Sequence, residues 1–228
     1  DTYEPFSMVY TDSDKTSKFG RVRWISLIGY DVNNTIFFDN KGNYMESPCE
    51  IWTNGVIKNI TFINKTDAEH HTQAEGRTFA YAVHSDFGTC KTRYENCYMY
   101  SNAGPAIGIG TWHDEVLEFY NCRFVSDCDG TFGAVGHGAF FCHTQTASGQ
   151  DATNQNLIMN SCMAIASKEA NGGRLAVIAG YEGTYSYELQ NCGFFGNNGA
   201  SVSLQAPDND LLNPYCFNNL PSILNTAN

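Results

Sequence analysis

Short stretches of alternating residues recur along the chain, and each begins with Asn or Ser followed by Ile or Cys. The five members are Asn59-Ile60-Thr61-Phe62, Asn96-Cys97-Tyr98-Met99, Asn121-Cys122-Arg123-Phe124, Ser161-Cys162-Met163-Ala164 and Asn191-Cys192-Gly193-Phe194. Their second positions, residues 60, 97, 122, 162 and 192, lie 37, 25, 40 and 30 residues apart. One short strand that returns at irregular steps is typical of stacked coils joined by loops of variable length. The pattern therefore predicts an all-β chain that coils.

Two further families of strands accompany this first family. The second family consists of Val83-His84-Ser85-Asp86, Ile107-Gly108-Ile109-Gly110, Phe140-Phe141-Cys142-His143, Val177-Ile178-Ala179-Gly180 and Val202-Ser203-Leu204-Gln205. Because side chains alternate along a strand, its first and third positions point inward and its second and fourth positions point outward. The third family, residues 116–119, 157–159 and 185–189, runs directly into the Asn or Ser of the first. Three strands per coil predict a single-stranded parallel β-helix of roughly six to seven coils, stacked about 4.8 Å apart.

The residues that begin the first family predict a tight corner. Asn tolerates the left-handed backbone conformation, and its side-chain amide can form a hydrogen bond to a neighbouring residue. An Asn at the first position of each member can therefore form a tight bend without glycine. The next position holds Cys97, Cys122, Cys162 and Cys192, which would stack in successive coils as an inward ladder of free thiols. Such a ladder favours assembly in a reducing compartment, and a secreted protein with a few disulfides is the alternative.

A single elongated domain accounts for the whole chain of 228 residues, of which 42% are hydrophobic. We assign residues 21–206 to the β-helix, 1–20 to an incomplete first coil or a linker, and 207–228 to a C-terminal cap or tail. In the N-terminal quarter, residues 24–29, 35–38 and 49–52 are predicted strands.

The charge and the composition exclude several classes of function. A formal net charge of −11, with only 13 Lys and Arg, argues against nucleic acid as a partner. No apolar run of about 18 residues is present, so we expect no membrane insertion. We expect no cofactor and no metal. Asp127 and Asp129 provide too few ligands for Ca²⁺, and Glu69 with His70-His71, which could bind a transition metal, is more typical of a solvated loop.

Several of these segments resemble known β-helix proteins. Residues 59–64 and 119–124 resemble pectinesterase segments, and the chain resembles the pectin-lyase-like right-handed parallel β-helix superfamily. Residues 25–29, 81–86 and 106–110 are similar to tailspike and tail-fibre proteins of phages and prophages of gut bacteria. The resemblance covers about residues 20 to 205. It implies a right-handed helix, a homotrimer, a place in the virion tail and a bacterial surface polysaccharide as partner.

The resemblance does not extend to the pectinesterase catalytic residues. Neither Cys97 nor Cys122 is followed by the Gln-Asp pair of that family, and no Gly-Arg-Pro-Trp occurs. We therefore do not expect pectin demethylation, and whether the chain is an enzyme stays open.

The outward row of the second strand family is the predicted binding surface. Gly108 and Gly110 would leave a shallow trough, although they could equally accommodate strand stacking or a neighbouring subunit. Aromatic and hydrogen-bonding side chains along it suit sugar rings. The candidate glycan-binding residues are His84, Asp86, Trp112, His113, His143, Tyr181 and Gln205.

Catalysis along the same trough is the second hypothesis. Two carboxylates on adjacent coils could hydrolyse a glycoside, or a histidine base could support a lyase reaction. The candidates are Asp86, Asp114, Glu115, Glu182 and His143, with Asp127 and Asp129 as further carboxylates. The favoured function is therefore a phage tail β-helix that binds a cell-surface glycan and is assembled in the host cytoplasm. The alternatives are a polysaccharide depolymerase and a structural or adhesive β-helix, secreted or on a cell surface.

Overall fold

The computed structural model describes the parts of the chain that form the strands and their corners. These are residues 2–3, 6–7, 23–39, 49–51, 53–67, 81–88, 91–111, 115–129, 138–144, 155–167, 177–179, 185–196 and 202–204. They contain strands and connections but no helix. All the strand pairs among them are parallel, as in β10 (Lys91–Glu95) with β13 (Val116–Tyr120). The predicted all-β architecture with parallel sheets is confirmed.

The strands form three seven-stranded sheets. Sheet 1 contains, in order, β1 (Thr2–Tyr3), β5 (Ile36–Asp39), β8 (Thr61–Asn64), β11 (Tyr98–Ser101), β14 (Arg123–Ser126), β17 (Met163–Ala166) and β20 (Gly193–Phe195). Sheet 2 contains β3 (Arg23–Trp24), β7 (Thr53–Lys58), β10, β13, β16 (Gln155–Asn160) and β19 (Tyr185–Gln190), with β4 (Leu27–Ile28) also paired to β7. Sheet 3 contains β2 (Phe6–Ser7), β6 (Cys49–Glu50), β9 (Val83–Gly88), β12 (Ile107–Thr111), β15 (Phe140–Thr144), β18 (Val177–Ala179) and β21 (Val202–Leu204).

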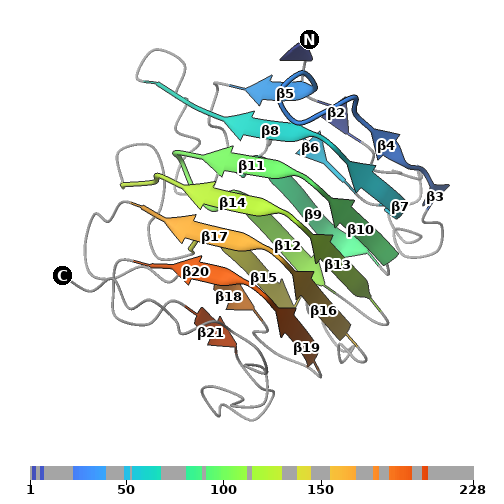
Figure 1. Cartoon of the computed structure of the whole chain (residues 1–228), viewed down its shortest axis with the longest axis vertical. Helices are drawn as coiled ribbons and strands as arrows, with labels where there is room; N and C mark the ends of the chain where they lie inside the picture. Colours follow the sequence, from blue (N-terminus) through green and yellow to red (C-terminus); the bar gives the residue numbers. More distant parts are fainter. Residues whose placement is uncertain are drawn as a thin grey trace.

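Consecutive strands visit the three sheets in turn. From β7 onward the chain passes through sheet 2, sheet 1 and sheet 3, and then returns to sheet 2 beside the strand it left. We call three such strands a round. Figure 1 shows sheets 1 and 2 side by side, with sheet 3 behind them. This order is compatible with a parallel β-helix.

Left-handed corners lie between sheet 2 and sheet 1. The five positive-φ residues other than glycine in the described chain have φ between 50° and 59° and begin the five members of the first strand family: Asn59, Asn96, Asn121, Ser161 and Asn191. The side-chain amide of Asn96 donates to Asn59 at 2.9 Å, and that of Asn121 donates to Asn96 at 3.2 Å. The predicted asparagine corner is confirmed.

The cysteine ladder is also confirmed. Each of the four cysteines is at most 2% exposed and lies between a corner residue and the first residue of one of four adjacent strands: Cys97, Cys122, Cys162 and Cys192. Each thiol donates to backbone carbonyls, as Cys122 does to Tyr94 O and Tyr120 O at 3.5 and 3.4 Å. Burial raises the pKa of the Cys122 thiol well above its ordinary value. All seven cysteines in the described part of the chain are buried.

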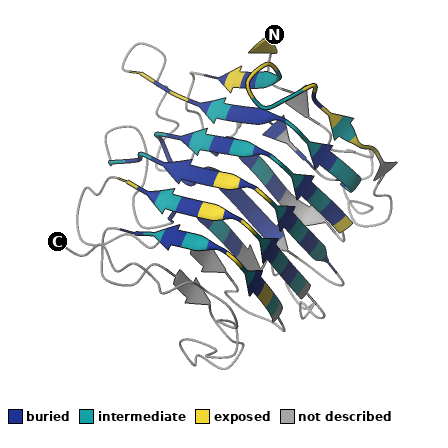
Figure 2. Cartoon of the chain, in the orientation of Figure 1, coloured by how far each residue is buried: buried dark blue, intermediate teal, exposed yellow. Residues whose placement is uncertain are grey.

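Aromatic rings join the three sheets at the centre of one round. Phe119 of sheet 2, Phe124 of sheet 1 and Phe140 of sheet 3 meet edge to face, with ring centroids 5.2 to 5.4 Å apart. Tyr94, from the preceding round, stacks on Phe119 at 4.9 Å. Buried and less buried residues alternate along the strands around this core (Figure 2). The predicted inward positions Val83, Ile107 and Phe140 are fully buried, which confirms the register.

One predicted strand is interrupted. Residues 24–29 were expected to form one strand, but β3 and β4 are separate two-residue strands. Between them, Ile25 N donates to Thr53 Oγ1 at 3.1 Å, and Ser26 Oγ accepts from Val56 N at 3.0 Å. A Cβ on Gly55 would come within 2.2 Å of the Ile25 carbonyl oxygen. Glycine therefore permits this close approach, and the side-chain bonds accompany a backbone bond from Ile25 N to Asn54 O at 3.2 Å.

Candidate functional site

The residues of the predicted trough align in rows across the strands of sheet 3. His84 pairs with Gly108, which pairs with Phe141, and Ile178 and Ser203 continue this row. A second row places Asp86, Gly110 and His143 side by side. The alignment of these positions across successive rounds is as predicted.

The first of these rows does not form an open trough at Gly108. A Cβ on Gly108 would come within 2.3 Å of the Tyr81 ring, so this ring occupies the space above the glycine. The same ring stacks on His84, with centroids 4.9 Å apart and an interplanar angle of 2°, and Tyr81 is only 4% exposed. The backbone of Gly108 is therefore covered by the chain itself rather than open to a ligand.

The other predicted site residues are placed to different extents. Asp86 and His143 are described by their backbone alone, and Glu115 is only 1% exposed, so its carboxylate lies in the interior. The remaining candidates lie outside the described residues: Trp112, His113, Asp114, Tyr181, Glu182 and Gln205, together with Glu69 and His70-His71. The binding and catalytic roles assigned to these residues stay predictions.

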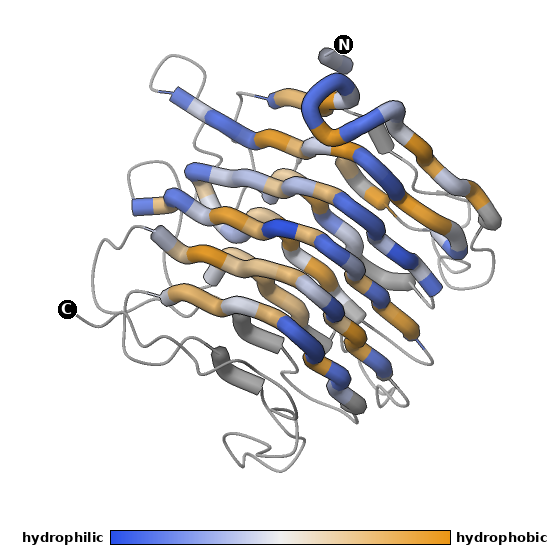
Figure 3. Tube along the Cα trace, in the orientation of Figure 1, coloured by the Kyte–Doolittle hydropathy of each residue, from blue (hydrophilic) through white to orange (hydrophobic). Residues whose placement is uncertain are grey.

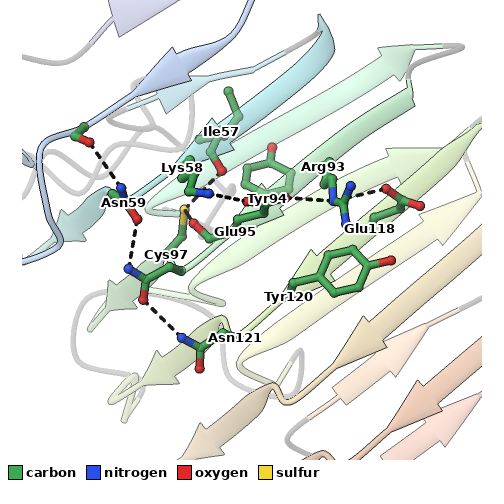
Figure 4. A network of polar contacts seen from close by, with 12 residues as sticks. Ile57, Lys58, Asn59, Arg93, Tyr94, Glu95, Cys97, Glu118, Tyr120 and Asn121 are labelled. Carbon is green, nitrogen blue, oxygen red and sulfur yellow. Dashed lines mark hydrogen bonds and ion pairs between the residues drawn. The ribbon is translucent and has the colours of Figure 1, made fainter.

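A network of charged side chains, which the sequence analysis missed, covers the outer face of sheet 2 (Figure 4). Lys58 Nζ lies 2.8 Å from Glu95 Oε2, and Arg93 Nε lies 3.0 Å from Glu95 Oε1 and 3.6 Å from Glu118 Oε2. The Arg93 guanidinium also lies 4.3 Å from the centre of the Tyr120 ring. The hydrogen bond from Lys58 lowers the pKa of Glu95. These cations are neutralised by carboxylates of the same face, so the network links adjacent rounds.

The outer face of sheet 1 is apolar. One outward row, which we call the apolar row, crosses six successive strands in register: Phe38, Ile63, Tyr100, Val125, Ile165 and Phe195. Phe38 is 38% exposed, as is Met163 in the neighbouring row, whereas Val125 is 8% exposed. In Figure 3 the hydrophobic colour dominates β17, which contributes to this face. Sheets 1 and 2 therefore present outer faces of opposite character.

Polar side chains interrupt this face at its centre, in what we call the tyrosine cluster: Tyr98, Tyr100, Arg123 and Asp127. Tyr100 Oη donates to Asp127 Oδ2 at 3.0 Å, and the Ser167 hydroxyl donates to the other oxygen of Asp127. The Arg123 guanidinium carbon lies 5.9 Å from the centre of the Tyr98 ring. Arg123 is exposed, and both tyrosines are half-buried.

Burial raises the pKa of Tyr98, and burial followed by the hydrogen bond to Asp127 raises that of Tyr100. Both phenols are therefore neutral at physiological pH. The sequence analysis had named Asp127 only as one carboxylate among several. The other three residues of the cluster, Tyr98, Tyr100 and Arg123, could have been found from the alternation of the first strand family, which places their side chains outward.

The described ranges contain no group of three or more His, Cys, Asp or Glu that could hold a metal ion. The same ranges contain no helix with the length and hydropathy needed to cross a membrane. Comparisons with protein-family models, curated proteins and solved structures find no match.

Proposed function

We propose that the chain is a right-handed parallel β-helix of the tailspike or tail-fibre type that binds a bacterial surface glycan on the outer face of sheet 1. The passage of consecutive strands through three parallel sheets supports the helix. Its hand is the one that crossover connections between parallel strands almost always take. The location in a virion tail and the homotrimer rest on the sequence resemblance.

The tyrosine cluster is the observation that carries the glycan assignment. Sugar rings bind where a flat aromatic face lies beside directional hydrogen-bonding groups. Tyr98 and Tyr100 provide two phenol rings on one strand, and Arg123 and Asp127 provide a planar donor and a planar acceptor beside them. The apolar row spans five steps of about 4.8 Å, or about 24 Å, along the stacking direction. A chain of several sugar rings fits that length.

The dimensions of the face favour a chain-like ligand over a folded protein. Sheet 1 has seven strands, and β8, β11, β14 and β17 have four residues each. Seven strands separated by about 4.8 Å give the sheet a length of about 29 Å, and a strand of four residues gives it a width of about 13 Å. The flat area of the face is therefore roughly 380 Å². This is about half of the roughly 800 Å² that each partner buries in a stable protein interface. A stable trimer interface would therefore need surface beyond this face.

Binding measurements with aromatic variants test the proposal. Tyr98→Ala and Tyr100→Ala are expected to weaken binding to extracted bacterial surface polysaccharide by at least about tenfold, as loss of a central aromatic contact does. Tyr120→Ala, which removes a half-buried tyrosine from the outer face of sheet 2, is the matched control and is expected to bind like the parent. Equal binding by all three variants would contradict the assignment to sheet 1, once circular dichroism has shown that they fold.

The same samples distinguish binding from cleavage. New reducing ends, or the absorbance of unsaturated sugars, would favour the depolymerase instead. Failure of the parent chain to bind any surface polysaccharide would favour the structural or adhesive β-helix. Native mass measurement tests the homotrimer separately, and a monomer would contradict it.

A further inference from the structure

Arg123 differs from the other arginine on the outer faces of the central rounds. Arg93 is held between Glu95 and Glu118, and Lys58 pairs with Glu95, so these cations are already neutralised. Arg123 is exposed and forms no ion pair with the residues that the structure describes. It projects from β14 between Tyr98 and Met163, which are its partners in the two adjacent strands. A guanidinium that no carboxylate of the described residues neutralises thus lies within the face proposed to bind glycan.

The surroundings of Arg123 suit a single carboxylate. Its guanidinium carbon lies 5.9 Å from the centre of the Tyr98 ring, and a guanidinium binds a carboxylate through two parallel hydrogen bonds. The Asp127 carboxylate of the same cluster accepts hydrogen bonds from Tyr100 and Ser167 and forms no ion pair with Arg123. It therefore adds a negative charge to this face. This charge, and the formal net charge of −11, would repel a polymer that carries an acid on every unit.

Building on the proposed function, we propose that the glycan is largely neutral and carries an isolated acidic sugar whose carboxylate binds Arg123. The neutral sugars lie along the apolar row, and the acidic sugar sets the register of the glycan on the face. Arg123 is then a specificity-determining residue, whereas the tyrosines contribute affinity for any sugar ring.

The test compares one polysaccharide in two chemical forms. The probe is an extracted surface polysaccharide that contains some hexuronic acid, used as isolated and after chemical reduction of its carboxyl groups to alcohols. The parent chain is expected to bind the acidic form at least about tenfold more tightly, because charge-assisted bidentate hydrogen bonds are among the strongest available. Arg123→Gln is expected to bind both forms equally, at the level of the parent with the reduced form.

Matched variants separate this inference from the proposed function. Lys91→Gln removes one exposed positive charge from sheet 2, just as Arg123→Gln does from sheet 1, and is expected to keep the preference for the acidic form. Tyr98→Ala is expected to weaken binding of both forms. Equal binding of the two forms by the parent, or a preference that survives in Arg123→Gln, overturns the inference but leaves the proposed function standing. Binding of neither form by the parent overturns both.

Discussion

At the scale of single residues, the left-handed corners are what allow each round to turn from sheet 2 into sheet 1. A left-handed conformation costs most residues about 1–2 kcal/mol, and Asn reduces this cost through local hydrogen bonds of its short side chain. Four of the five corners hold Asn, and the fifth, Ser161, has φ 56°. The Ser161 hydroxyl donates to Asn160 at 2.8 Å and so does not extend the row of amides that joins Asn59, Asn96 and Asn121.

Replacing Ser161 by Asn is expected to stabilise the fold by about 1 kcal/mol. The new amide would relieve part of the backbone cost and could bond to Asn121 in the adjacent round. Ser161→Val is the control and is expected to destabilise, because a β-branched residue fits a positive φ poorly. Urea denaturation measures both changes, and a lower free energy of unfolding for Ser161→Asn than for the parent would refute the expectation.

Tyr100 is expected to make the fold sensitive to alkali. Its pKa is raised in the folded chain by burial and then by Asp127, so it keeps its proton at a pH where tyrosines of the unfolded chain ionise. Stability is therefore fully present below about pH 10 and declines as the pH rises above it. Tyr100→Phe is expected to lose less stability than the parent between pH 8 and pH 11 in urea titrations. An identical decline in both proteins would show that Tyr100 does not contribute.

At the scale of the elements, the three sheets are held together by side chains that meet inside each round. The backbone hydrogen bonds between paired strands run along each sheet from round to round, so these ladders do not join one sheet to another. The Phe119, Phe124 and Phe140 rings provide that connection in the round formed by β13, β14 and β15. Edge-to-face pairs of this kind contribute about 0.5–1.5 kcal/mol beyond the burial of their area.

Phe119→Ala is expected to cost about 3–5 kcal/mol, the usual range for a buried phenylalanine, because it leaves a cavity between all three sheets. Phe195→Ala removes the same side chain from the half-buried outer face of sheet 1 and should cost much less. Thermal and chemical denaturation would compare the two variants. Similar losses would indicate that the centre of the round is not where the sheets are joined.

At the scale of the whole molecule, each round pairs with the rounds before and after it, so the fold is built by repetition. Stability in such a fold is close to a sum of terms between nearest neighbours. The N-terminal strands β1 to β4 have two residues each, whereas the strands from β10 to β17 have four to six. The repetition also sets the outer faces apart, with the charged network of Lys58, Arg93, Glu95 and Glu118 on sheet 2 and the apolar row on sheet 1.

Native-state hydrogen exchange should therefore be graded along the chain. Amides in β10 to β17 are expected to exchange most slowly, because their strands have paired neighbours on both sides. Amides in β1 to β4 are expected to exchange fastest among the strands. Exchange monitored by mass spectrometry would check this order, and uniform protection would mean that the rounds open together.

The strand pattern, the asparagine corners and the cysteine ladder could be predicted from the sequence, because alternation and tolerance of positive φ are properties of neighbouring residues. Only the tertiary structure decided that Tyr81 covers Gly108 and that Arg93 lies between Glu95 and Glu118. These contacts depend on which residues loops of unequal length bring into adjacent rounds, and for that reason no local pattern of residues could reveal them.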